Sequence, residues 1–99
     1  MGQDLQFSSR PRRVTESSEC RKYIRELFET YPRFREVLIA IRRDLQDFAH
    51  HEAISHPSLS GYFFKRTAKC FETPSFTYYY TYDDGSAEIK WIEVTDDTG

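Results

Sequence analysis

The alternation of aromatic and polar positions is strongest between residues 76 and 94. Phe76-Thr77-Tyr78-Tyr79-Tyr80-Thr81-Tyr82 is almost wholly aromatic and β-branched, which favours a pleated, half-buried strand. Asp83-Asp84-Gly85-Ser86 follows, and its Asp-Gly pair predicts a tight turn in which Gly85 takes a positive φ. Because side chains alternate along a strand, one face is predicted to carry Phe76, Tyr78, Tyr80 and Tyr82, and the other Thr77, Tyr79 and Thr81. We therefore expect a central β-hairpin from Phe76 to Val94.

Two stretches before this hairpin repeat apolar side chains at the spacing of an α-helix. The first follows candidate N-caps in Thr15–Ser18, with Glu16 and Glu19 expected in its first turn. Its apolar stripe consists of Cys20, Tyr23, Ile24, Leu27, Phe28 and Tyr31. Pro32 ends it, and the second stripe consists of Phe34, Val37, Leu38, Ile41, Leu45, Phe48 and Ala49. With almost no linker between them, the two helices are predicted to form a helical hairpin.

The remaining strands carry weaker signals. Leu5-Gln6-Phe7-Ser8 alternates like a short strand, which Pro11 ends, and Arg10, Arg12 and Arg13 form a basic corner. A further strand is expected over Tyr62–Phe71, with a turn at Thr73-Pro74-Ser75. The order β-α-α-β-β-β predicts a single α+β domain over residues 1–99, with the helical hairpin packed on one face of a small antiparallel sheet. The pattern leaves open which strand pairs with the first.

Composition agrees with a small folded domain. Hydrophobic residues make up 38% of the 99 residues, and the 16% aromatic share adds large buried areas. Cys20 and Cys70 are too few for a disulfide framework, so we expect two small buried hydrophobes, with a bridge between them as the alternative. The sequence has no apolar run of membrane-spanning length and no signal peptide, which predicts a cytoplasmic protein that does not enter a membrane.

Charge is distributed unevenly although the net charge is only −2. The span from Arg10 to Arg43 holds ten basic residues and five acidic ones. Such a span could face an acidic protein partner or nucleic acid; the alternative is a solvated helical surface with interspersed ion pairs. The candidate partner-binding residues are Arg21, Arg25, Arg42 and Arg43. A partner, or a second copy of the chain, is expected on the helical hairpin or on an exposed strand edge.

Motifs for common chemistry are missing from the sequence. His50, His51, His56 and Glu52 could be drawn as a metal site, but no Cys lies near and nothing fixes their geometry, so we expect a solvated loop with no metal and no cofactor. The sequence contains no Gly-rich phosphate loop, no nucleophile elbow and no HExxH run.

The chain resembles the RelE/ParE superfamily of small bacterial toxins. The resemblance runs from the short strand ending in Phe7-Ser8, through the helical hairpin, to Leu59-Ser60-Gly61-Tyr62. It is completed by Ser75-Phe76-Thr77-Tyr78-Tyr79-Tyr80 and by Glu88-Ile89-Lys90-Trp91-Ile92-Glu93-Val94. The resemblance implies a toxin held inactive by an antitoxin, and members of the superfamily either cut mRNA on the ribosome or poison DNA gyrase.

The chain departs from the pattern of the RelE-like nucleases at two places. Thr77 stands where they usually carry an arginine, and Thr95-Asp96-Asp97 stands where basic or histidine residues usually follow the last strand. RNA cleavage requires a base near the 2′-OH or cations against the phosphate. The candidates that remain are Lys65, Arg66, Lys69, Lys90 and Tyr79. Lys65 and Lys69 are expected on one strand face, with Arg66 on the other, and we assign any activity to these two lysines, with Tyr79 stacking on a base from the same sheet surface. For each lysine, the alternative is a solvent-facing sheet residue.

These observations favour a toxin component, in degenerate form, that binds an antitoxin and a macromolecular target such as the ribosome with its mRNA or DNA gyrase. If it is an enzyme, it is expected to be a ribosome-dependent mRNA endoribonuclease with an atypical site. A non-toxic interaction or regulatory module of the same fold is the alternative. An unrelated α+β domain that shares the element order is a third interpretation, because fold does not fix function.

Overall fold

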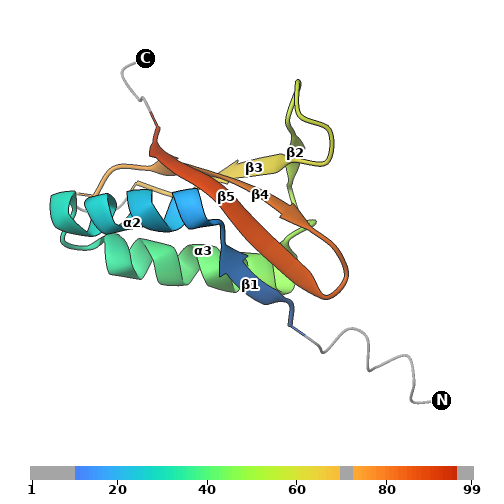
Figure 1. Ribbon diagram of the computed structural model, residues 1–99, viewed down its shortest axis with the longest axis horizontal. Coiled ribbons are helices and arrows are strands. Elements are labelled where there is room, and N and C mark those ends of the chain that lie inside the picture. Colours follow the sequence, from blue (N-terminus) through green and yellow to red (C-terminus); the bar gives the residue numbers. More distant parts are fainter. Residues whose placement is uncertain (1–10, 70–72, 96–99) are drawn as a thin grey trace.

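The computed structural model describes residues 11–69 and 73–95 and contains one five-stranded sheet with two helices on one face (Figure 1). The elements in chain order are β1 (Arg13–Glu16), α2 (Ser18–Thr30), α3 (Phe34–Phe48), β2 (Ile54–Ser55), β3 (Phe63–Arg66), β4 (Phe76–Tyr82) and β5 (Ser86–Val94). The strand order in the sheet is β1-β5-β4-β3-β2. This confirms the α+β class and the two helices packed on one face.

Both helices follow their predicted apolar stripes. Ser17 is the N-cap of α2, and its hydroxyl accepts a hydrogen bond from the Cys20 amide at 3.1 Å. The side chains that α2 buries are Cys20, Ile24 and Leu27, and those that α3 buries are Phe34, Ile41 and Leu45. Pro32 lies between the two helices as expected. The stripes therefore predict the positions of both helices and the centres of the faces that they bury. Phe28 and Phe48, which were also placed on the stripes, lie at the edges of these faces and are 37% and 55% exposed.

The core lies between the helices and the central hairpin of β4 and β5. Phe76, Tyr78 and Tyr80 are buried on the predicted face of β4. The ring of Phe76 meets that of Phe34 edge to face with centroids 5.1 Å apart. Tyr80 is fully buried, and its hydroxyl donates a 2.6 Å hydrogen bond to the carbonyl oxygen of Ala49 just after α3. The hairpin is thus bound to the helices by packing and by a buried polar contact.

The hairpin departs from strict alternation at one point. Tyr79 pairs with Trp91 but Tyr80 pairs with Ile89, so Lys90 is an extra residue in β5. This bulge lets Ile89 and Ile92 both face the helices although they are three residues apart. Trp91 consequently stays partly exposed, which contributes to the site described below.

The turn between β4 and β5 forms at the predicted residues but by a different mechanism. Gly85 does not take a positive φ, so that prediction was wrong. Instead, the carboxylate of Asp83 accepts hydrogen bonds from the amides of Gly85 at 2.9 Å and Ser86 at 2.8 Å. These bonds lower the pKa of Asp83, the Gly85 amide contributing most. The side chain of Asp83, and not a left-handed glycine, therefore closes the turn.

The first described strand lies later than expected. The predicted strand Leu5-Gln6-Phe7-Ser8 falls outside the described residues, and β1 occupies Arg13–Glu16, where a basic corner and a helix start were expected. β1 runs parallel to β5 at one edge, so the sheet is mixed and not wholly antiparallel. Only Val14 in β1 is buried, and a single apolar residue gives no periodic signal.

The strand expected over Tyr62–Phe71 is shorter, because β3 ends at Arg66. The amide of Thr67 still donates to Phe76, and the Thr67 hydroxyl accepts the Phe76 amide at 2.9 Å. The added strand β2 pairs with β3 and forms the other edge of the sheet. Cys20 is a free, buried thiol, and burial raises its pKa to about 12; Cys70 lies outside the described residues.

Candidate functional site

The sheet face that the helices leave uncovered carries a concavity of about 550 Å³, here called the open-face concavity. Its walls come from the start of α2, the loop between β2 and β3, and β5, with β4 between them. The lining residues are Ser17, Glu19, His56, Leu59, Tyr62, Tyr79, Lys90, Trp91 and Glu93. This volume and the aromatic lining with a few polar groups are typical of binding sites.

Tyr79 lies at the centre of this surface. Its hydroxyl donates a 2.9 Å hydrogen bond to Oε2 of Glu93. Its ring lies 5.6 Å from that of Phe64 and 6.0 Å from that of His56, between centroids. Desolvation, followed by the hydrogen bond to Glu93, raises the pKa of Tyr79, so the phenol stays neutral at physiological pH. Tyr79 therefore presents a fixed aromatic surface and not a base.

The loop after β2 forms one wall and is ordered by His56. Nδ1 of His56 accepts hydrogen bonds from the amides of Ser58 and Leu59, both at 3.0 Å. Because that nitrogen is an acceptor, Nε2 carries the proton of the neutral ring. The bonded loop holds Leu59 with 49% of its surface exposed. An apolar side chain held outward by a hydrogen-bonded loop is a feature of contact surfaces.

Trp91 forms the opposite wall. Its indole stacks on the ring of Tyr23 from α2, with centroids 4.7 Å apart and planes 7° apart, and 37% of its surface stays exposed. Stacking restricts the indole without burying it. Rigid, partly exposed Trp and Tyr side chains are the residue types that most often dominate protein interfaces.

The charges in the concavity favour cations over phosphates. The ammonium group of Lys90 contacts the carboxylate of Glu88, and this hydrogen bond raises the pKa of Lys90. Beyond the pair of Lys90 with Glu88, the lining holds the carboxylates of Glu19 and Glu93, and the positive charge of Arg66 acts on Tyr79 from the neighbouring strand, so carboxylates outnumber the remaining cation. Such a surface repels a nucleic-acid backbone and attracts basic groups.

The predicted catalytic residues are not brought together. Nζ of Lys65 donates to Oδ2 of Asp44 and to the carbonyl oxygen of Phe48, both at 2.8 Å, and its side chain is only 11% exposed. Lys65 pairs with Tyr78 and faces the helices, whereas Tyr79 faces the open side. The expected shared surface for these two residues was therefore wrong, because Asp44 provides a counter-charge inside the fold.

Lys69 and Thr77 also do not lie as a ribonuclease site would require. Lys69 is exposed and lies beyond the end of β3, so it does not share a strand face with Lys65 as predicted. Thr77, where the resemblance implies an arginine, is buried and its hydroxyl is 2.7 Å from that of Thr95. Thr77 therefore supplies no cation, and Lys69 is not part of the strand that pairs with β4.

The four candidate partner-binding arginines have different environments. Arg21 and Arg25 are exposed on α2, and Arg43 is exposed on α3. Arg42 instead makes an ion pair with Glu16 and donates to the carbonyl oxygen of Val14 at 3.0 Å. Arg42 thus joins α3 to β1, and its removal would disturb the fold before any partner contact.

The histidine-rich loop shows no metal arrangement. His51 lies 3.6 Å from Glu52 with both side chains mostly exposed, and His56 serves the loop as described above. Within residues 11–69 and 73–95, no group of three potential ligands is placed to hold a metal ion. No helix in the same part of the chain is long and apolar enough to cross a membrane.

The sequence correctly placed Tyr79 on the strand face opposite Tyr78 and Tyr80. It did not indicate the residues that surround Tyr79 there, which include His56, Leu59, Tyr62 and Trp91. The loop residues have no periodicity that would assign them to a face. Trp91 could be placed only by locating the bulge at Lys90.

No protein-family model matches this chain, and no curated protein and no solved structure matches it.

Proposed function

We propose that this protein is the toxin component of a toxin–antitoxin pair of the RelE/ParE type, and that it acts by binding a protein target without cutting RNA. The single observation that carries the binding mode is the open-face concavity, where Tyr79 and Trp91 lie among unneutralised carboxylates. The toxin assignment rests on the resemblance of the chain to that superfamily, together with the α+β fold.

The chemistry of the concavity specifies the occupant. Glu19 and Glu93 attract a cationic group, and the faces of Tyr79 and Trp91 can hold an Arg or Lys side chain by cation–π contact. Leu59 adds an apolar contact at the wall. The target is therefore a protein segment that presents a basic residue beside an apolar one.

Ribonuclease activity has little support from these contacts. Lys65 is engaged by Asp44 inside the fold, and the open face that carries Tyr79 is acidic. Developing negative charge on a phosphate needs donors or cations close to it, and each such group typically contributes about 3 kcal/mol. The cations near Tyr79 are Lys90, which is paired with Glu88, and Arg66 on the neighbouring strand, so binding without cleavage is the function that we propose.

An antitoxin would occupy a different surface. Arg21 and Arg25 are exposed on the outer side of α2, where an acidic antitoxin segment finds complementary charge. Changing these two residues to Glu together tests this contact with the fold intact, because neither has a described ion pair. A non-toxic interaction module of the same fold is the alternative function, and it would use the same concavity.

The decisive experiment is inducible expression in bacteria, with growth and mRNA integrity on translating ribosomes followed together. We expect growth arrest without mRNA cleavage. Leu59→Asp and Glu93→Lys should each relieve the arrest. Ile54→Asp is the matched control, because Ile54 is similarly exposed at 54% but lies outside the concavity, and it should leave the arrest unchanged.

Each other outcome has a defined meaning. Normal growth with the folded protein present would favour the non-toxic module. Robust cleavage that survives Glu93→Lys would show that the protein is a nuclease with a site elsewhere.

A further inference from the structure

The outer sides of α2 and α3 meet at Phe28. The ring of Phe28 packs edge to face on that of Phe34 with centroids 5.5 Å apart, and the guanidinium group of Arg35 lies 5.7 Å from the Phe28 centroid. Phe34 and Arg35 are the first two residues of α3. Phe28 nevertheless keeps 37% of its surface exposed. The side of α2 that carries Phe28 and the side of α3 that carries Arg35 are therefore neighbours on the surface.

Helical spacing extends this surface along both helices. Two arginines of α2 precede Phe28 by three and seven residues, and two residues of α3 follow Arg35 by four and eight, so each set shares one side of its helix. We call the result the α2–α3 face, and it consists of Arg21, Arg25, Phe28, Arg35, Ile39 and Arg43.

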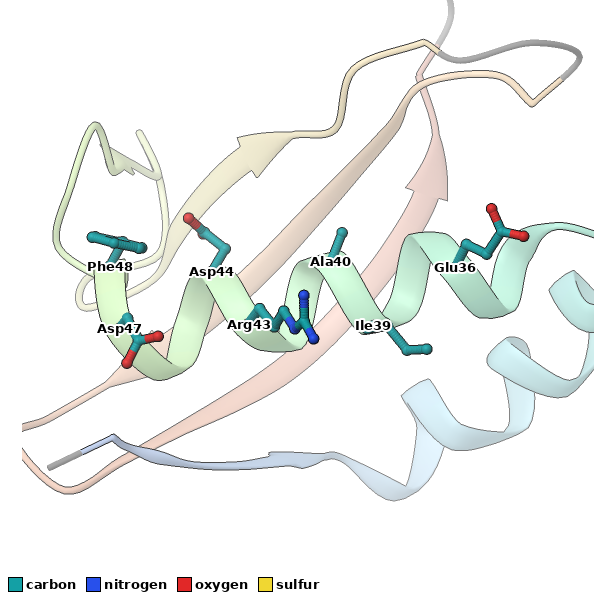
Figure 2. A pocket seen from close by; sticks show the side chains of 7 residues that line it. All are labelled: Glu36, Ile39, Ala40, Arg43, Asp44, Asp47 and Phe48. Atoms are coloured by element: carbon teal, nitrogen blue, oxygen red, sulfur yellow. The ribbon is translucent and has the colours of Figure 1, made fainter.

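Ile39 is the second exposed apolar residue of this face, with 48% of its surface exposed. Figure 2 shows its side chain pointing to the side of α3 on which α2 lies, whereas Asp44 and Phe48 point to the opposite side, toward β3. Phe28 and Ile39 can therefore contact the same partner, and Phe48 cannot join them.

The charge of the α2–α3 face is positive. Its four arginines are all exposed, and in the part of the chain that the structure describes none of them is in an ion pair. Glu36, the carboxylate beside Arg35 in the sequence, is paired with Arg33 at 3.1 Å. Glu29 and Asp47 lie at the margins of the face, so the arginines outnumber the carboxylates that remain.

We propose that the α2–α3 face binds an acidic amphipathic helix of a partner protein. Its carboxylates accept hydrogen bonds from the arginines, whose planar guanidinium groups can bind a carboxylate through two parallel bonds. Apolar side chains that recur at the spacing of one helix face pack against Phe28 and Ile39. A phosphate backbone matches the charges equally well but leaves these two apolar side chains without a contact, so the face favours a protein over a nucleic acid.

This inference deepens the proposed antitoxin contact at Arg21 and Arg25, and it rests on that proposal only for naming the partner an antitoxin. It adds α3 to the contact, and it specifies the helical form of the partner and its apolar side chains. The α2–α3 face lies on the helical side of the sheet and the open-face concavity on the other, so binding to each can be measured separately (Figure 1).

The test is fluorescence anisotropy with a labelled synthetic peptide of about 18 residues, long enough for about five helical turns. The peptide carries Leu along one helix face, Glu on the flanks of that face and Ala elsewhere. A shuffled peptide of the same composition, in which the Leu residues no longer share a face, is the control. Over about 1 μM to about 1 mM of the protein, the amphipathic peptide should bind at least about tenfold more tightly than the shuffled one.

Variants of the protein locate the contact. Arg25→Glu combined with Arg35→Glu should weaken binding of the amphipathic peptide by about tenfold or more, because like charges then face each other. Ile39→Asp should weaken it as well, because it places a carboxylate in the apolar contact. Arg66→Glu, an equally large charge change at an exposed position of β3, should leave it unchanged. Circular dichroism of each variant confirms that the helices are intact.

The opposite results would overturn the proposal. They are no binding by the wild type, equal binding of the shuffled peptide, and binding that ignores the arginine and Ile39 variants. Tighter binding of a single-stranded RNA oligonucleotide, lost in the same arginine variant, would assign the face to nucleic acid instead. None of these results depends on growth arrest, so peptide binding without any arrest would contradict only the proposed toxin function.

Discussion

Tyr79 and Tyr80 are neighbours on β4 but serve opposite sides of the molecule. Tyr80 points to the helices, has no exposed surface, and donates its hydroxyl hydrogen to the carbonyl oxygen of Ala49 at 2.6 Å. Tyr79 points to the open face and donates to Glu93 within the concavity. Identical side chains one residue apart thus differ in what they can do, because one is enclosed by the fold and the other is held where a partner can reach it.

Two lysines of the sheet, Lys65 and Lys90, also lie on opposite faces. Lys65 is enclosed with Asp44 on the helical side, whereas Lys90 lies on the open side beside Glu88 and Tyr62. Residue type alone would assign both lysines to solvent. The helical side of the sheet therefore maintains the fold, and the open side is available for binding.

The largest expected effect comes from truncating the inward tyrosine. Tyr80→Ala removes a fully buried ring and leaves the carbonyl oxygen of Ala49 without its partner. Urea unfolding should show a loss of about 3 kcal/mol or more. Tyr79→Ala, the control on the same strand, should lose less than about 1 kcal/mol, because its ring is not enclosed. Equal losses would mean that the two faces are equally important to the fold.

Lys65→Ala should produce the next largest effect. It leaves the carboxylate of Asp44 with only the Tyr78 hydroxyl as a partner in a largely enclosed place. Removing one member of a fully buried ion pair costs about 3–5 kcal/mol, and the partial exposure of Asp44 reduces the expected loss to about 2 kcal/mol. Arg66→Ala, on the exposed side of the same strand, should change the free energy of unfolding by less than about 0.5 kcal/mol.

Arg42→Ala should have a smaller effect that is again on stability. It removes the ion pair with Glu16 and the hydrogen bond to Val14 that join α3 to β1. We expect a loss of about 1–2 kcal/mol. Arg43→Ala should leave thermal unfolding nearly unchanged. A loss with Arg43→Ala as large as that with Arg42→Ala would contradict the structural assignment of Arg42.

The smallest effect, taken at pH 10, comes from two titratable groups on the enclosed side, Cys20 and Tyr78. Burial, together with Glu16 and Glu88, raises the pKa of Cys20 from 9.0 to about 12, so the folded state favours the protonated thiol. Burial followed by Asp44 raises the pKa of Tyr78 in the same direction. The stability that Cys20 contributes is complete below about pH 9 and is lost as pH rises toward 12, by about 1 kcal/mol at pH 10. The loss from Tyr78 begins about one pH unit higher, because its unfolded pKa is 10.0, and is less than about 0.5 kcal/mol at pH 10. Urea midpoints measured between pH 8 and 11 should therefore fall, and a flat profile would count against this burial.

Much of the fold follows from the sequence because its periodic signals are strong. The stripes of α2 and α3 and the alternation of β4 predict which faces pack against each other, and Phe34 and Phe76 from these faces are in contact. The edge strand β1 could not be predicted, because Val14 is its only buried residue. Gly85 was misjudged because the carboxylate of Asp83 forms the turn that a left-handed glycine was expected to form.

The site was less predictable than the fold. Lys65 turns inward because Asp44, distant in sequence, supplies its counter-charge, and no local pattern reports such a pairing. The open-face concavity combines a loop residue, Leu59, with Trp91, whose orientation depends on the bulge at Lys90. The orientation of Lys65 and the lining of the open-face concavity are both set by tertiary contacts and not by local propensity.

The division between the two faces of β4 is tested most directly by measuring growth inhibition and the free energy of unfolding on the same variant, Tyr79→Ala. The account predicts that growth inhibition is lost while the free energy of unfolding stays within about 1 kcal/mol of the wild type. Growth arrest as strong as that of the wild type, from a variant equally well folded, would contradict it.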